Sequence, residues 1–305
     1  MKYLVIGAGG TGGMLAFALA KHHKDVTVIA RNQHLQAIQE HGLTVERTYM
    51  NMVETVSVQA TDMDRYDDVP DIIFVCVKYY SLDACVPFIK RVAGKQTIVI
   101  PILNVFSTGM TLQEQLPELL VTDGCIYISS FIDRPGVLKQ TGAIFRVIFG
   151  VREAKDARPE LDIVAKDLCE CGIDSHVSNE IQREALEKFS YVSPIGAAGV
   201  YLNAKAGDFQ KEGDARELFK QMIREVMDLA AAMGHPFKED YVERNLKILD
   251  GIAPESTTSM QRDILAHRQS EFDGLVNEIV RLGERYGVDV PGYKMISDAL
   301  KDEIV

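Results

Sequence analysis

A glycine-rich segment near the start of the chain constrains the fold more than any other feature. Residues 7–13 read GAGGTGG, directly after the apolar run 3–6 and directly before the apolar run 14–19. This order is typical of a strand, a glycine turn and a helix, with the spacing Gly7-x-Gly9-x-x-Gly12 of a dinucleotide-binding loop. The first glycine allows the tight turn, the second admits a pyrophosphate close to the backbone, and the third lets the helix pack on the strand.

The helix after these glycines would offer backbone N–H groups and a partial positive charge to phosphates. A glycine-rich loop without a ligand is the alternative interpretation, and the flanking strand and helix favour the binding site. We therefore predict a cofactor-binding loop with these members: Gly7, Ala8, Gly9, Gly10, Thr11 and Gly12.

Arg31 lies where the choice of cofactor is expected. In NAD-binding proteins an acidic residue about 20 positions beyond the glycines accepts the ribose 2′-hydroxyl. This chain has Arg31 there instead, directly after the strand-like run 25–30. A guanidinium matches a 2′-phosphate in charge and geometry, so we predict NADPH rather than NADH. The alternative is a solvated arginine at the end of a strand.

Composition and charge exclude several classes of protein. The net charge of −11 disfavours a nucleic-acid partner, because a phosphate backbone requires a basic surface. No apolar run reaches the length of about 20 residues that spans a membrane, and the chain starts in a core strand without a signal peptide, so we expect a cytoplasmic protein. Five scattered cysteines lack metal-ligand spacing, so we predict no disulfide framework and no metal site.

Strand-like and helical segments alternate over the first half of the chain. Nearly continuous apolar runs at 71–77 and 96–102 are typical of parallel strands buried on both faces, and 82–93 is helical. We predict an α/β fold with a Rossmann-type, doubly wound parallel sheet, extended by antiparallel strands within 124–150. Long helical periodicity follows, so we divide the chain into a nucleotide domain, 1–178, and an all-helical C-terminal domain, 179–305.

Polar side chains follow two of these predicted strands. Lys78 comes directly after the run 71–77, and Asn104 follows the run 96–102. Ligands of doubly wound sheets bind at the carboxyl ends of the strands, so we place both residues at the cofactor site. A solvated cation and a turn-forming amide are the alternatives.

At this point the chain resembles the 2-dehydropantoate 2-reductase (ketopantoate reductase) family from end to end. The resemblance rests on the glycine loop with Arg31 and on these segments: CVK at 76–78, LN at 103–104, GVLKQTG at 136–142, EKF at 187–189, SM at 259–260 with Asp263, and EFD at 271–273 with Asn277. It implies a Rossmann domain plus a helical domain, with NADPH reducing a 2-oxo acid in the cleft between them. It also implies that Lys188 is the general acid, that Lys78 and Asn104 contact cofactor and substrate, and that Ser259 and Glu271 hold the substrate.

The chain departs from the family pattern behind the lysine. Members that reduce ketopantoate usually carry asparagines four and eight residues after it, where this chain has Val192 and Gly196. A pocket without those amides cannot hydrogen-bond the same substrate in the same way. The residues therefore support the reaction type more strongly than the identity of the substrate. Ketopantoate is the leading single substrate, and another branched or bulkier 2-oxo acid is the alternative.

Residue chemistry supports these roles independently of the family. Lys188 lies in an otherwise apolar helical segment, where a lysine must snorkel, pair or act on a ligand. Protonating a ketone oxygen requires a donor whose pKa can be tuned, which a lysine offers. The alternative is that Ser259 and Glu271 only occupy the first turns of helices. Thr258 and Gln261 have capping-box spacing around Ser259, and a carboxylate such as Glu271 is favoured near a helix N-terminus.

The spacing of Ser259 and Glu271 carries a geometric prediction. On one unbroken helix the two residues would lie about 18 Å apart along the axis, so one small substrate could not touch both. We predict two helices, the second beginning within a residue or two of Ser270, with Ser270 and Asp273 as a capping-box-like pair.

Taken together, the residues predict an NADPH-dependent oxidoreductase that converts a small 2-oxo acid into the 2-hydroxy acid. The alternatives are a paralogue with another 2-oxo acid substrate, a dehydrogenase of the 6-phosphogluconate or opine type, and a non-catalytic NADP-sensing protein. The sequence leaves the oligomeric state open, with a homodimer as one option.

Overall fold

The computed structural model describes residues 1–300, which form two compact units. The first unit comprises Met1–Leu103 and Thr108–Ile181. The second comprises the short loop Asn104–Ser107 and the chain from Gln182 onward. Within residues 1–300, no helix combines the length and apolar character needed to cross a membrane.

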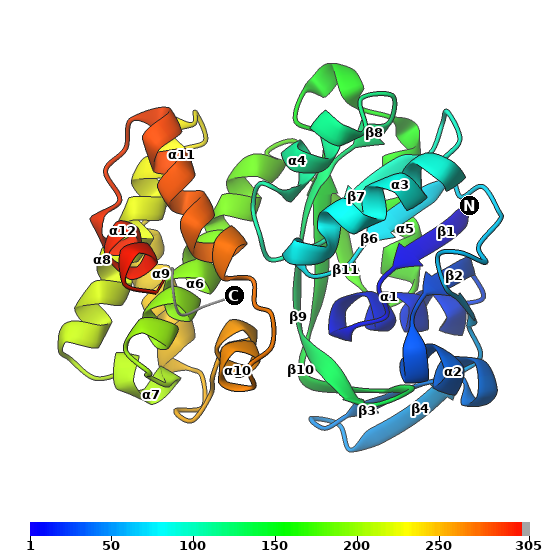
Figure 1. Ribbon diagram of the computed structural model, residues 1–305, viewed down its shortest axis with the longest axis horizontal. Helices are drawn as coiled ribbons and strands as arrows, with labels where there is room; N and C mark the ends of the chain where they lie inside the picture. Colours follow the sequence, from blue (N-terminus) through cyan, green and yellow to red (C-terminus); the bar gives the residue numbers. More distant parts are fainter. Residues whose placement is uncertain (301–305) are drawn as a thin grey trace. The chain divides into compact units, whose positions relative to one another are not determined.

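The first unit is built on a six-stranded parallel sheet (Figure 1). Its strand order is β5-β2-β1-β6-β7-β8, and each neighbouring pair is parallel. The strands are β1 (Lys2–Ile6), β2 (Asp25–Ile29), β5 (Gln59–Thr61), β6 (Ile72–Val75), β7 (Ile98–Pro101) and β8 (Leu120–Val121). The predicted doubly wound α/β class is confirmed.

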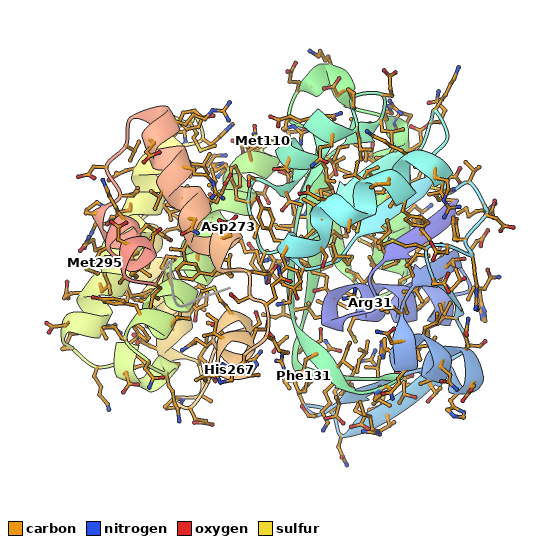
Figure 2. The ribbon with its side chains drawn as sticks, viewed as in Figure 1. Arg31, Met110, Phe131, His267, Asp273 and Met295 are labelled. Carbon is orange, nitrogen blue, oxygen red and sulfur yellow. The ribbon has the colours of Figure 1, made fainter. Side chains whose placement is uncertain are left out.

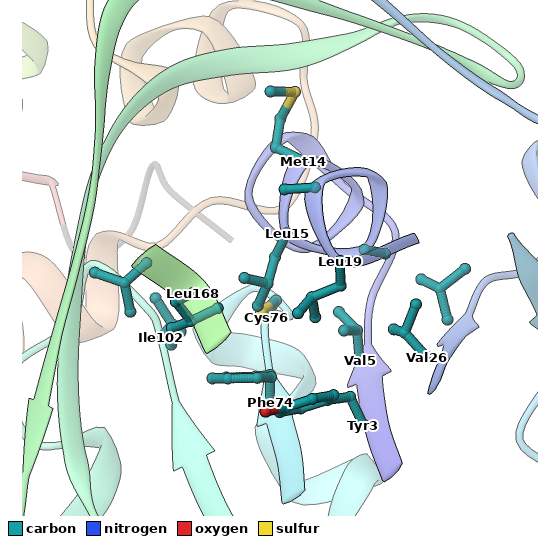
Figure 3. Close-up of a cluster of buried hydrophobic side chains, with 14 of the residues drawn as sticks. Tyr3, Val5, Met14, Leu15, Leu19, Val26, Phe74, Cys76, Ile102 and Leu168 are labelled. Carbon is teal, nitrogen blue, oxygen red and sulfur yellow. The ribbon is translucent and has the colours of Figure 1, made fainter. Parts of the chain in front are cut away.

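Alternation along β1 sends side chains to two separate cores. Tyr3 and Val5 point to one face of the sheet, where they pack with α1 (Gly10–Lys21) and α5 (Pro159–Glu170). Leu4 and Ile6 point to the other face, which is covered by α3 (Leu82–Val92) and α4 (Thr108–Gln115). Figure 3 shows the first of these cores around Phe74 and Leu15. Burial on both faces explains why these strands read as continuous apolar runs.

A second sheet corrects one of the expectations. The strands predicted within 124–150 do pair in antiparallel fashion, as the long hairpin of β9 (Asp123–Arg134) and β10 (Val137–Gly150) (Figure 1). They do not extend the first sheet, because the other neighbours of β10 are β3 and β11. The remaining strands of this five-stranded sheet are β3 (Leu43–Arg47), β4 (Met52–Val56) and β11 (Asp174–Val177). Helix α2 (Asn32–His41) links β2 to β3.

The described part of the second unit is helical, as predicted. Its longest helix is α6 (Ile181–Tyr201). The others are α7 (Ala206–Phe209), α8 (Asp214–Ala232), α9 (Tyr241–Asp250), α10 (Ser259–Leu265), α11 (Glu278–Tyr286) and α12 (Pro291–Leu300), with a π-helical segment, η3 (Asp273–Asn277), directly before α11.

Helix α6 continues through Pro194 to Tyr201. A proline inside a helix cannot donate to the carbonyl four residues before it, here that of Ser190. Asn245 of α9 replaces the missing donor, since its side-chain amide lies 3.1 Å from the Ser190 carbonyl oxygen and 3.0 Å from Ser190 Oγ. Asn245 is 1% exposed, so this substitute bond is shielded from water.

Asn245→Ala should lower the free energy of unfolding by about 1 to 3 kcal/mol, because it leaves a buried carbonyl without a donor. Pro194→Ala supplies a backbone N–H to that carbonyl. In the Pro194→Ala background the cost of Asn245→Ala should therefore fall by about 1 kcal/mol. Urea unfolding of the two single variants and the double variant measures this coupling. An identical cost in both backgrounds contradicts the compensation.

Candidate active site

The glycine loop between β1 and α1 has the close contacts that its spacing predicts. Gly7 has φ +101°, a conformation that favours glycine. A Cβ on Gly12 would lie 2.0 Å from the Gly7 carbonyl oxygen and 2.7 Å from Cys76 Cβ. The third glycine of the motif therefore lets α1 approach the end of β1 and the neighbouring strand end at van der Waals distance.

Gly9 differs from its neighbours because it faces open space. A Cβ on Gly9 would meet no atom of residues 1–300 within 4 Å. Gly9 is also the N-cap of α1, and the first turn of this helix has neither an acidic residue nor a side-chain cap. Backbone N–H groups that are not neutralised by a carboxylate, beside an open position, suit a pyrophosphate.

The β9–β10 hairpin holds the other side of this loop, a feature that sequence reasoning missed. Ser130 Oγ donates to the Gly10 carbonyl oxygen at 2.9 Å, and a Cβ on Gly13 would lie 2.7 Å from Leu138 Cδ1. His34 adds a second link, since its imidazole lies 2.9 Å from the Ala8 carbonyl oxygen. The only local signal was the helical spacing of His34 with the buried Ile38.

The two predicted cofactor cations lie at strand ends of the first unit. Arg31 is exposed and forms the N-cap of α2, two residues after the end of β2 (Figure 2). Lys78 is half-buried and precedes the short 3-10 turn Tyr79–Ser81 that follows β6. Both sit at the carboxyl ends of parallel strands, as the sequence predicted.

Lys188 and Asn104 are brought into direct contact in the second unit. Lys188 Nζ donates to Asn104 Oδ1 at 2.9 Å, across 84 positions of sequence. Lys188 lies on α6, and Asn104 belongs to the loop Asn104–Ser107, which packs with the second unit. Both side chains are half-buried. The bond orients an ammonium group with a neutral amide, so the cationic charge is not cancelled by a carboxylate at this contact.

The start of α10 packs against α6 beyond Lys188. A Cβ on Gly196 would lie 3.1 Å from Met260 Cε, and one on Gly199 would lie 2.8 Å from the Gln261 side chain. Ser259 is therefore carried by a segment that lies on α6 about two to three turns after Lys188. The predicted capping box of Thr258 and Gln261 is formed.

The chain breaks between Ser259 and Glu271, as predicted. Helix α10 ends at Leu265, and Leu275 N–H donates to the Glu271 carbonyl oxygen at 2.9 Å in the first turn of the next helix. Ser270 Oγ accepts from Phe272 N–H at 3.4 Å. Glu271 is 4% exposed, which argues against mere surface decoration at a helix start.

The expected pairing of Ser270 with Asp273 is wrong. Asp273 Oδ1 accepts instead from Asn277 at 3.1 Å and from Arg281 at 3.0 Å, one and two turns further on. These bonds favour the ionised carboxylate, and the Arg281 hydrogen bond is the main reason that the pKa of Asp273 is lowered. That Ser259 and Glu271 hold one ligand stays a prediction.

An ion pair between the buried Asp123 and Arg152 lies beside the start of α4, a few residues after Asn104. No sequence motif predicted it. Asp123, 3% exposed, accepts from Arg152 at 2.8 Å, and burial raises its pKa to about 6. A Cβ on Gly109 would lie 1.9 Å from Asp123 Oδ1. Gly109 therefore lets the first turn of α4 rest directly on this carboxyl group.

The described residues contain neither a metal-binding cluster nor a disulfide. Within residues 1–300, no three His, Cys, Asp or Glu side chains are grouped to hold a metal ion. All five cysteines are free thiols, and four of them are buried. Burial raises the pKa of the Cys85 thiol to about 11.

Comparison with known proteins gives consistent matches over the whole length. The family model described as "Ketopantoate reductase PanE/ApbA" matches residues 3–154, and "Ketopantoate reductase PanE/ApbA C terminal" matches residues 180–303. The 2-dehydropantoate 2-reductase of Aquifex aeolicus is 24% identical over 306 residues, covering 99% of this chain and 96% of that protein.

Solved structures share the fold. A PanE/ApbA family ketopantoate reductase from Ralstonia eutropha superposes with a TM-score of 0.89 at 22% identity, covering 99% of this chain and 97% of that one. A D-mandelate dehydrogenase, solved with NADH and anilino(oxo)acetate, gives a TM-score of 0.86 at 21% identity, covering 99% and 98%.

Two alanine substitutions in the glycine loop should have opposite signatures. Gly12→Ala drives a methyl group into a backbone carbonyl, so it should lower the free energy of unfolding by at least about 2 kcal/mol. Gly9→Ala should change it by less than about 0.5 kcal/mol and instead weaken binding of a dinucleotide by about tenfold or more. Thermal unfolding and ligand titration separate the two effects. Unchanged dinucleotide affinity of Gly9→Ala would remove Gly9 from the site.

Proposed function

Because the chain belongs to the ketopantoate reductase family, whose members are oxidoreductases, we propose that it reduces a small 2-oxo acid to the 2-hydroxy acid with NADPH. The observation that carries this proposal is the hydrogen bond between Lys188 Nζ and Asn104 Oδ1 at 2.9 Å. It holds a proton donor in a fixed orientation in a half-buried position. A protein that merely sensed NADP would have no use for such a donor.

Lys188 acts as the general acid. Lys188 Nζ donates to Asn104 Oδ1, and an ammonium group can donate to the ketone oxygen of the substrate as well. As negative charge develops on that oxygen, the ammonium stabilises it and then transfers a proton. Asn104 keeps the ammonium directed, and because its amide is neutral this hydrogen bond does not itself neutralise the charge.

Ser259 and Glu271 serve as substrate ligands. The Ser259 hydroxyl can donate to the substrate carboxylate, and the Glu271 carboxylate can accept from a hydroxyl group of the substrate. The chain break between α10 and η3 supports this assignment, because a continuous helix would have kept the two residues about 18 Å apart.

The first unit binds the cofactor in this proposal. The open position at Gly9 and the uncapped start of α1 fit the pyrophosphate, and the exposed Arg31 fits the 2′-phosphate that distinguishes NADPH from NADH. Lys78, at the neighbouring strand end, contacts the same cofactor. When bound, the reduced nicotinamide supplies the hydride.

Ketopantoate is the leading substrate, and one feature of α6 favours a more apolar 2-oxo acid as the alternative. Val192 and Gly196 follow Lys188 by one and two helical turns, so they lie on the same side of α6. Gly196 is covered by the Met260 side chain. This side of the helix therefore offers apolar contacts to a substrate. The structurally similar D-mandelate dehydrogenase, solved with anilino(oxo)acetate, supports an aromatic or branched side chain.

Lys188→Ala should lower kcat by about 10² to 10⁴ and leave the Kd for NADPH nearly unchanged, because the lysine acts on the ketone oxygen. Lys247→Ala is the matched control, since Lys247 is an exposed lysine of the same unit. Single-turnover rates and cofactor titrations measure the two quantities. Near-normal turnover of Lys188→Ala would exclude its role as the acid.

Arg31→Ala should abolish the preference for NADPH. A charge-assisted hydrogen bond to the 2′-phosphate should make NADPH bind about 1.5 to 3 kcal/mol more tightly than NADH. Fluorescence titration with both cofactors measures this difference, and Arg65→Ala provides a control at an exposed arginine of the same unit. Equal dissociation constants in the unaltered protein would show that Arg31 does not select the cofactor.

The substrate is tested by oxidation of NADPH with a panel of 2-oxo acids that contains ketopantoate, a branched aliphatic acid and an aryl acid. Val192→Asn adds an amide on the Lys188 side of α6, so it should raise kcat/KM for ketopantoate relative to the aryl acid by about tenfold. Val192→Ala removes bulk without adding an amide and should leave that ratio within about threefold. Absence of turnover with every 2-oxo acid would overturn the proposed reaction.

A further inference from the structure

His34 makes two hydrogen bonds that join segments far apart in the sequence. It lies in the first turn of α2, three residues after Arg31, and is half-buried. The Gly136 N–H donates to His34 Nδ1 at 3.0 Å, and His34 Nε2 lies 2.9 Å from the Ala8 carbonyl oxygen. Because Nδ1 accepts this hydrogen bond, the hydrogen of the neutral ring must be on Nε2, which donates to the Ala8 carbonyl oxygen.

The two partners of His34 belong to the glycine loop and to the turn of the β9–β10 hairpin. Ala8 lies between Gly7 and Gly9, in the middle of the loop that fits a pyrophosphate. Gly136, with φ +76°, forms the turn of the β9–β10 hairpin, whose Ser130 also bonds the Gly10 carbonyl. The imidazole thus ties the glycine loop to the hairpin and to the helix that begins at Arg31.

The arrangement requires an uncharged ring. A protonated imidazole has two N–H donors and no acceptor, so the Gly136 N–H would face another donor. Burial lowers the pKa of His34 below its ordinary value of 6.5, which keeps the ring neutral at pH 7. The ring therefore gains its proton, and the bond to Gly136 is lost, as the pH falls through the acidic range.

The ionisable groups on the elements around His34 lie on α2 and at the hairpin turn. On α2 the ionisable residues are Arg31, Glu40 and His41. At the hairpin turn, Asp133 pairs with Arg134 and Lys139, and Arg134 pairs with Glu46 of β3. The glycine loop and the first turn of α1 contain no ionisable side chain.

We propose that neutral His34 is a positioning residue that holds the glycine loop in its dinucleotide-binding conformation, so that protonation of His34 weakens cofactor binding. The inference rests on the proposed function, since it assigns the cofactor to this loop. It adds a residue that touches neither cofactor nor substrate and acts through the Ala8 carbonyl and the Gly136 N–H.

The test measures the Kd for NADPH between about pH 5 and pH 8. The proteins compared are the unaltered protein, His34→Gln and His34→Ala. The control is His41→Gln, which changes an exposed histidine of the same helix. The unaltered protein and the control should lose at least about fivefold in affinity toward pH 5, beyond any change seen in His34→Gln. Glutamine can donate and accept but does not titrate, so its affinity should stay within about threefold of the unaltered protein at pH 8. His34→Ala should bind about tenfold more weakly at pH 8.

Ratios of Kd between variant and unaltered protein at each pH cancel the titration of the 2′-phosphate, whose second pKa is about 6. A pH-independent ratio for both His34 variants overturns the inference while the proposed function stands. Failure of the unaltered protein to bind NADPH or NADH at any pH overturns the proposed function itself. If His34→Ala does not fold, ¹⁵N NMR of the unaltered protein still decides, because a proton on Nδ1 at pH 8 contradicts the assigned hydrogen bonds.

Discussion

The contact between Gly12 of α1 and the carbonyl oxygen of Gly7 is the constraint on which the first unit depends. Any side chain at position 12 would overlap that oxygen, so the helix can start here only because both ends of the loop are glycine. The approach places α1 between the parallel sheet and the hairpin sheet, where Met14 to Leu19 are buried. Because residues 12–19 of this helix are buried, its N-terminus has a fixed position, and the backbone N–H groups there are directed without any side-chain cap.

In the second unit, side chains from other helices supply backbone hydrogen bonds that α6 and the π-helical segment η3 do not make within themselves. Asn245 donates to the carbonyl that Pro194 leaves without a partner. Ser193, one residue before that proline, donates to the Leu275 carbonyl at 2.5 Å within the π-helical segment and also contacts the hydroxyl of the buried Tyr293. Irregular hydrogen bonding in both helices is thus satisfied by tertiary contacts, and Lys188 projects from a helix whose course these contacts maintain.

Local pattern predicted what depends on local chemistry. Apolar runs identified the parallel strands, the glycine spacing located the loop, and the Thr258–Gln261 capping box marked the start of α10.

The second sheet was missed because the partners of β10, which are β3 and β11, lie far away in sequence. The continuation of α6 through Pro194 has no local signal, because the donor that proline lacks is replaced by the distant Asn245. Asp273 was expected to cap its own helix, and the competing Arg281 guanidinium takes it instead. The roles of Lys188 and Asn104 came mainly from family resemblance, since no local rule pairs residues 84 positions apart.

The placement of Asn104–Ser107 has a consequence for dissecting the molecule into fragments. The chain leaves the first unit at Leu103, contributes four residues to the second, returns at Thr108, and crosses again only after Ile181. A recombinant fragment that begins near Gln182 would contain every described helix of the second unit and still lack the partner of Lys188. Complementation with a separate N-terminal fragment would have to restore that hydrogen bond across a nick in the polypeptide. A gene cut at the apparent domain border would therefore separate the Lys188 ammonium from the Asn104 amide that accepts its hydrogen bond.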